Sequence, residues 1–127
     1  MINALFNQPN YLAIKKLLDG TVLRQEAIAS NLANLETPNY KRIDVAPSFN
    51  VALSQALAAK NPAEINGVQP SLEVDAAAIA QNRDGSTVEL ETELMHLNKN
   101  ALAHALETQL ITGSLLRLRL AISGRPN

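Results

Sequence analysis

The placement of proline is the feature that most restricts how this chain can fold. The sequence of 127 residues contains six prolines, and they leave two long stretches without one, residues 10–37 and residues 71–125. Proline inside an α-helix removes a backbone hydrogen bond and costs about 3 kcal/mol. Long helices are therefore expected only within these two stretches, one toward each end of the chain.

The first stretch carries an apolar stripe with helical spacing. Alternating steps of three and four residues from position 11 to position 35 meet six apolar residues among eight positions, the pattern of a helix that packs against another helix. Asn10 is the expected N-cap, and the helix is expected to end at Thr37-Pro38, because the residue before proline avoids the α conformation. Gly20 weakens this helix by up to about 1 kcal/mol relative to alanine, so a packing partner is expected.

The second stretch predicts a longer helix with two apolar stripes. The same stepping from residue 90 to residue 122 meets eight apolar residues among ten positions, and a leucine stripe runs beside it from residue 102 to residue 120. Two stripes indicate more than one packing partner, as in a bundle or a helical assembly. Acidic residues near the expected start and arginines near the expected end complement the helix dipole.

From the two helices together we expect one apolar stripe through which subunits assemble, and we call it the predicted seam. Its residues are Ile14, Leu18, Ile28, Leu32, Leu35, Leu90, Leu94, Leu97, Ile111, Leu115, Leu118 and Ile122. A helix from Glu89 to Ser123 would be on the order of 50 Å long at 1.5 Å per residue, too long for a compact globule of this size. The expected fold is mainly α and rod-shaped, with long N- and C-terminal helices packed as a coiled-coil-like pair within a helical tubular assembly.

The chain between the two helices has a different character. Residues 43–83 hold three prolines and short apolar pieces, which predict an irregular connecting segment with one short helix in residues 49–59 and a strand fragment at residues 72–74. The expected division is a discontinuous terminal-helix core, residues 1–42 with 84–127, and this connecting segment. Gly124, followed by Arg125 and Pro126, is expected to end the second helix.

Composition and residue spacing argue against most kinds of catalytic, metal and phosphate-binding site. The sequence has no cysteine, and its five glycines are scattered rather than gathered in a phosphate-binding loop. Glu93 and His96 have the Glu-x-x-His spacing of di-iron bundles, but a second such motif is missing, so we interpret them as a solvated helix face. His104 is interpreted as an interface or core residue. We therefore expect neither catalysis nor a metal or other cofactor.

The charge balance also excludes several partners. Eleven Lys and Arg face twelve Asp and Glu, and aromatic residues make up 3% of the chain, which argues against nucleic-acid binding. No apolar run approaches the ~20 residues of a membrane span. The N-terminus shows no cleavable signal sequence, so any export is expected to use another route.

Residues 29–42, ASNLANLETPNYKR, combine a helix end with a tight turn. Asn31 and Asn34 can hydrogen-bond backbone groups freed at the helix end. Residues 37–40 have the composition of a β-turn, with Asn39 at the third position, where positive φ is tolerated. The tyrosine that closes the turn is expected to fold back as an apolar ring with a hydroxyl tip.

This stretch resembles the N-terminal signature of the flagellar rod and hook proteins, N-x-A-N-x-x-T-P-G-Y. The corresponding positions are Asn31, Ala33, Asn34, Thr37, Pro38, Asn39, Tyr40 and Lys41. Asn39 stands where glycine is common, and asparagine is the next-best residue for a left-handed turn position. Residues 84–100 and 118–125 resemble later blocks of proximal rod proteins. Chain length and block order fit a proximal subunit of the flagellar basal-body rod family better than the longer distal rod or hook proteins.

The resemblance implies a structural subunit of the bacterial flagellar basal body. Such a subunit would be exported by the flagellar type III apparatus and assemble through its terminal helices into the periplasm-spanning rod that transmits torque. The implied partners are other copies of the chain, other rod subunits, the adaptor joining the rod to the membrane ring, and the flagellar export gate. Phe49 and Leu53 fit the short export-gate element of the family and also fit an ordinary packing helix. Lys41 and Arg42 are candidates for ion pairs with a neighbouring subunit.

Periodicity alone leaves one alternative open. The leucine stripes also fit a non-catalytic helical adaptor or an export-chaperone-like module that dimerises through them. The motif blocks favour the rod interpretation.

Overall fold

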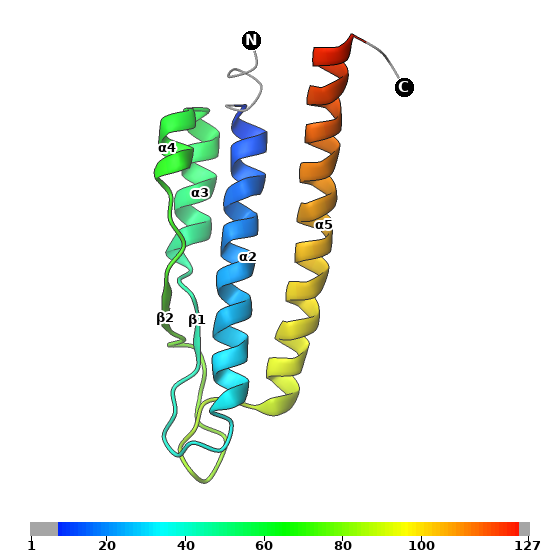
Figure 1. Cartoon of the computed structure of the whole chain (residues 1–127). Coiled ribbons are helices and arrows are strands. Elements are labelled where there is room, and N and C mark those ends of the chain that lie inside the picture. The colour runs from blue at the N-terminus through cyan, green and yellow to red at the C-terminus, as the bar shows by residue number, and fades with distance from the viewer. Residues whose placement is uncertain (1–7, 125–127) are drawn as a thin grey trace.

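The computed structural model describes residues 8–124 and is elongated and mainly helical (Figure 1). Its elements in chain order are α2 (Pro9–Ala33), β1 (Ile43–Val45), α3 (Ser48–Ala59), α4 (Pro62–Gly67), β2 (Leu72–Val74) and α5 (Leu90–Ser123). The long terminal helices α2 and α5 pack against each other, and an irregular middle with short strands lies between them in sequence. The predicted mainly helical fold, with long terminal helices packed together and an irregular middle, is confirmed.

The helix ends differ from the sequence prediction mainly in α2. Its N-cap is Gln8 rather than Asn10, because Pro9 occupies the first helical turn, where the N–H that proline lacks has no helical partner. It ends at Ala33, before the predicted Thr37-Pro38. For α5, Glu89 is the N-cap and Gly124 is the C-cap with φ of 64°, as predicted, whereas Arg125 and Pro126 lie outside the described residues.

A buried apolar cluster joins α2 to the middle segment. Its residues are Leu12, Ala13, Val45, Phe49, Leu53, Ala56 and Ile65. Gly20 explains how α3 approaches so closely, since a Cβ at this position would lie 2.7 Å from Cε1 of Phe49. A glycine that weakens the isolated helix therefore allows an aromatic ring to pack on it.

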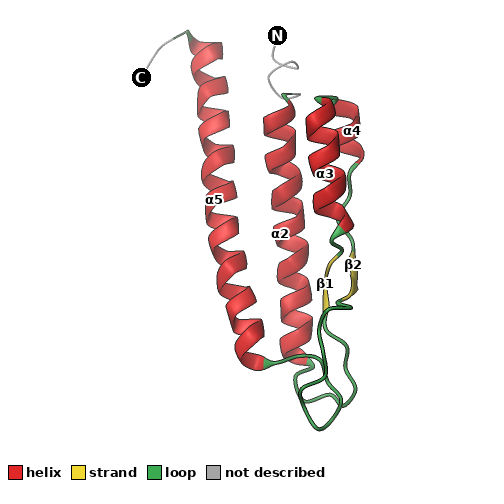
Figure 2. Ribbon diagram, turned by 180° about the vertical axis from the view of Figure 1, so that it is seen from behind, coloured by secondary structure: helices red, strands yellow, loops and turns green. Residues whose placement is uncertain are grey.

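The middle segment lies on the side of α2 opposite α5 (Figure 2). β1 and β2 form a two-stranded antiparallel sheet in which Ile43 pairs with Val74 and Val45 pairs with Leu72. The predicted short helix and strand fragment correspond to α3 and β2. The division of the chain into a terminal-helix core and a connecting segment stays a prediction, and the apolar cluster spans both parts.

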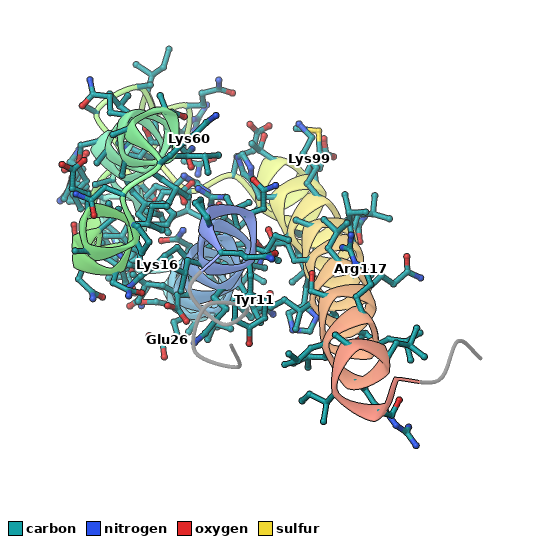
Figure 3. All side chains as sticks on the ribbon, turned by 90° about the horizontal axis from the view of Figure 1, so that it is seen from above. Tyr11, Lys16, Glu26, Lys60, Lys99 and Arg117 are labelled. Carbon is teal, nitrogen blue, oxygen red and sulfur yellow. The ribbon has the colours of Figure 1, made fainter. Side chains whose placement is uncertain are left out.

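The buried residues of α5 are polar, and most of its large apolar side chains are exposed. Its buried residues are Glu93, Asn100 and Glu107, spaced seven residues apart, and we call them the polar ladder. Toward the C-terminal end of α5 the two helices diverge (Figure 3). Leu102 and Leu106 on α5 are 73% and 58% exposed, so the apolar stripes of α5 remain largely uncovered within one chain.

Candidate functional site: a motif junction and a polar helix ladder

The end of α2 and the turn after it are held by hydrogen bonds within the first motif block. The side-chain amide of Asn34, the C-cap residue, donates to the carbonyl of Ser30 at 2.8 Å, and the Thr37 hydroxyl donates to Asn34 Oδ1 at 3.1 Å. The Tyr40 N–H donates to the Thr37 carbonyl at 3.3 Å, and Asn39 has φ of 59°. The predicted β-turn with a left-handed asparagine is confirmed.

Tyr40 folds back toward α2 as predicted. Its hydroxyl lies 3.0 Å from the hydroxyl of Ser30. Of the remaining motif positions, Ala33, Pro38 and Lys41 are exposed, whereas the fully buried Asn31 bonds both backbone groups of Ile43, donating to its carbonyl at 2.8 Å and accepting from its N–H at 3.0 Å. Asn31 therefore joins the helix end to β1.

The second motif block packs directly against the turn of the first. The Asn39 N–H donates to the carbonyl of Asp84 at 2.9 Å, and the Thr87 N–H donates to the carbonyl of Tyr40 at 3.0 Å. The Thr87 hydroxyl accepts from the N–H of Arg42 at 2.8 Å. Two blocks separated by more than forty residues in the sequence thus form one structural junction, the motif junction.

A buried arginine occupies the centre of the motif junction. The Arg42 guanidinium, whose side chain is 4% exposed, donates to Glu93 Oε2 at 2.8 Å and to Asp44 and Asp75 at 2.9 Å each. Asn31 donates a further bond to Glu93 Oε1 at 2.9 Å. Arg42 therefore connects α5, β1 and the segment after β2 at the base of α2, with every buried charge paired.

The arginines of this cluster hold Asp44 ionised. Burial acts to raise the pKa of the Asp44 carboxyl, but hydrogen bonds from Arg24 and Arg42 and from a backbone N–H outweigh it, and the pKa lies below its ordinary value. Burial likewise acts to lower the pKa of Arg42, and its bonds to Glu93 and Asp44 more than compensate and raise it. Both shifts favour the charged forms of Asp44 and Arg42.

Two sequence interpretations are corrected here. Glu93 is not on a solvated helix face, because its side chain is completely buried against Arg42. Arg42 does not extend to a neighbouring subunit, because its donors are taken up by carboxylates of its own chain. Both errors have the same cause: partners 51 residues apart in sequence cannot be recognised from local spacing.

The polar ladder continues along α5 toward its middle. The side-chain amide of Asn100 donates to the Thr21 carbonyl at 3.0 Å and to Gln25 Oε1 at 3.1 Å. Glu107 accepts from the Thr21 hydroxyl at 2.7 Å. These contacts were not predicted from the sequence, although the seven-residue spacing of three polar residues was the available signal. A single buried polar residue of this kind fixes the register of a helix pair.

The residues of the predicted seam differ in how far they are exposed in the single chain. Ile28 is fully buried, and Leu90, Leu94, Leu115 and Ile122 are exposed. The half-buried members are Ile14, Leu18, Leu32, Leu35, Leu97, Ile111 and Leu118. Their proposed role in assembly stays a prediction.

The other singled-out residues lie apart from the motif junction. Phe49 and Leu53 are buried on α3 within the apolar cluster, while His104 is exposed on α5 and is not a core residue. Among residues 8–124, no group of three or more His, Asp or Glu is placed to hold a metal ion. None of the helices described is both long and apolar enough to cross a membrane.

Comparison with known proteins identifies relatives of the chain. The family model of flagella basal body rod proteins matches residues 22–41, which include the end of α2 and its turn. The flagellar basal body rod protein FlgB of Borrelia hermsii is 32% identical over 113 residues, covering 75% of this chain and 82% of that protein. FlgB of Aquifex aeolicus (strain VF5) is 32% identical over 116 residues, covering 87% of this chain and 90% of that protein. On the motif blocks, their junction and these two relatives, the chain belongs to the family of flagellar basal body rod proteins.

Proposed function

We propose that the chain is a proximal rod subunit whose leucine-rich outer face of α5 is covered by neighbouring subunits. In this proposal it is exported by the flagellar type III apparatus and forms part of the periplasm-spanning rod that transmits torque. Its further partners would be the export gate and the adaptor that joins the rod to the membrane ring. The observation that supports the proposal best is that α5 buries polar residues against the rest of the chain while nine of its large apolar side chains stay exposed.

Family membership supports a more general function than the proposal does. The chain is a structural protein of the flagellar basal body rod, assembles with other rod subunits, and belongs to a family that is not enzymatic. That membership favours the rod over the adaptor or chaperone interpretation of the leucine stripes.

Covering the exposed apolar side chains of α5 would favour assembly. Nine large apolar side chains of α5 are exposed in the single chain, namely Leu90, Leu94, Met95, Leu102, Leu106, Leu110, Leu115, Leu116 and Ile122. Full burial of one such side chain contributes about 1.5–3 kcal/mol, so covering this half-exposed set yields on the order of 10 kcal/mol before the costs of association are subtracted.

Substitution on this face tests the assembly role. Leu102→Glu and Leu106→Glu should leave the monomer folded, since both side chains are exposed, and should abolish incorporation into basal bodies and swimming. Val51→Glu is the matched control, because Val51 is 59% exposed on α3. Normal motility and incorporation of the α5 variants would contradict the proposed function.

Phe49 and Leu53 are the candidate residues for recognition by the export gate. Each is 5% exposed in the folded chain, so we propose that the export gate reads them before folding. Phe49→Ala should then lower secretion, whereas Ile65→Ala, which opens the same apolar cluster, should not. Equal secretion of the two variants would reduce Phe49 to a packing residue.

A further inference from the structure

We propose that the groove between α2 and α5 around Asn100 receives the basic C-terminal part of α5 from a second copy of the chain. The groove has a volume of about 550 Å³ and lies midway along the helix pair. Residues of both helices line it, among them Val22, Glu26, Ala29, Asn100, Ala101 and His104. The proposal rests on the proposed function and specifies which surface of one subunit meets which surface of the next.

The first observation is an unpartnered acceptor in the groove wall. Asn100 is 4% exposed, and its Oδ1 atom receives no hydrogen bond from any residue that the structure describes. Its amide nitrogen is fully engaged with Thr21 and Gln25. A buried acceptor without a donor is unfavourable and rare. Because Oδ1 is closed to solvent in the single chain, it marks an incomplete polar contact between α2 and α5 at the groove wall.

The second observation is complementary charge. Glu26 is exposed and is the only Asp, Glu, Lys or Arg among the residues that line the groove. Residues 108–123 contain two arginines, Arg117 and Arg119, and no acidic residue. Both arginines are exposed, and neither forms an ion pair with the part of the chain that the structure describes. Guanidinium groups provide several N–H donors and pair well with carboxylates.

The third observation is apolar fit. Val22, Ala29 and Ala101 give the groove an apolar, shallow wall with small side chains. Leu116 and Leu120 adjoin the arginines on α5, and Leu116 is 50% exposed. A helix that carries leucines beside arginines can cover such a wall and direct a cation to its rim.

The contact must join two copies, because the donor and the groove of one copy cannot meet. Glu26 and Arg117 lie well apart, and α5 leans away from α2 toward its C-terminal end (Figure 3). Asn100 and Arg117 are separated by about 25 Å along α5 at 1.5 Å per residue. Joining the middle of one copy to the tip of another produces a heterologous, staggered contact, which propagates as an open helical array unless it closes.

Disulfide trapping tests the contact directly, because the natural sequence has no cysteine. The full chain carrying Ala101→Cys is mixed with a size-tagged chain carrying Leu116→Cys or Leu120→Cys and mildly oxidised. We expect at least one pair to give mixed dimers in at least tenfold higher yield than Ala58→Cys, an exposed α3 position, gives with the same partners. Yields at the level of Ala58→Cys for both pairs overturn the proposal.

A charge exchange tests the same contact without a covalent bond. Glu26→Arg, and separately the pair Arg117→Glu and Arg119→Glu, should each raise the dissociation constant of self-association about fivefold, measured by sedimentation. The chain with all three changes should return to within twofold of the natural protein. If the combined chain stays as weak as the partial variants, the charges act on folding and the proposal fails.

Filling the groove separates this inference from the proposed function. Ala101→Trp should abolish self-association with the helical circular dichroism unchanged, and Ala58→Trp should not. If Ala101→Trp associates normally while Leu102→Glu does not, the groove proposal is wrong and the rod function stands. If neither substitution affects association or incorporation, both are wrong. Capture at the groove of a different rod protein, but never of a second copy, also overturns the proposal.

Discussion

Replacing Arg42 by methionine should destabilise the chain more than any change at an exposed charge. Arg42→Met keeps much of the side-chain length but leaves Glu93, which is 0% exposed, without its guanidinium and removes the bonds to Asp44 and Asp75. Removing one partner from a buried ion pair costs about 3–5 kcal/mol, because the other charge stays buried and uncompensated. We expect a loss of that order in the free energy of unfolding.

Urea unfolding followed by circular dichroism measures this loss. With a slope of about 1–3 kcal/mol per molar urea for a chain of this size, the midpoint should fall by at least about 1 M. Arg24→Met is the matched control: Arg24 is 35% exposed and bonds only Asp44 among these carboxylates, so it should cost less than about 1 kcal/mol.

A double substitution separates the lost pair from lost packing. Arg42→Met with Glu93→Met removes both buried charges of the shortest contact, and it should recover at least half of the loss, since an apolar pair can replace a buried ion pair at little cost. The reasoning is refuted if Arg42→Met costs no more than Arg24→Met, or if the double variant is less stable than Arg42→Met.

Three further substitutions follow from the fold. Gly20→Ala should lower the free energy of unfolding by about 1–3 kcal/mol by overpacking against Phe49, and Phe49→Leu in the same chain should relieve it; a stabilised Gly20→Ala would show that the ring yields freely. Gly85→Ala should cost a similar amount, because Gly85 has φ of 78° and a Cβ there would overlap Asn39 Oδ1; unfolding curves that coincide with the natural protein would contradict this. Because the folded-state pKa of Asp44 is lowered, its contribution is present above its ordinary pKa of 3.8 and is lost as pH falls through the folded value. Asp44→Asn should therefore lower the free energy of unfolding near pH 7. As the pH falls, the variant should lose less of that free energy than the natural chain, and identical pH profiles of the two proteins would contradict a lowered pKa of Asp44.

The sequence was sufficient for elements whose causes are local. Proline placement and apolar spacing predicted α5 to within one residue, and the turn chemistry of residues 37–40 predicted the left-handed Asn39 and the returning Tyr40. These features depend on residues close together in the chain, where steric and capping preferences act.

The inner contacts could not be predicted in the same way. Hydrophobic periodicity weights apolar positions, so it assigned the inner face of α5 to apolar residues and passed over the three residues of the polar ladder. Glu93 and Asn100 become suitable for burial only beside Arg42 and Thr21, which come from the other end of the chain. The same holds for Gly20, whose role depends on Phe49. Long-range partners determined these positions, and a single sequence does not reveal them.

The central claim is that the outward leucines of α5 are exposed in one chain and covered in the rod. Thiol labelling of Leu106→Cys, the only cysteine in that variant, compares its reaction rate with a maleimide in the purified monomer and in isolated basal bodies. We predict fast labelling in the monomer, where Leu106 is 58% exposed, and at least tenfold slower labelling in basal bodies. Equal rates in the two states would contradict the claim.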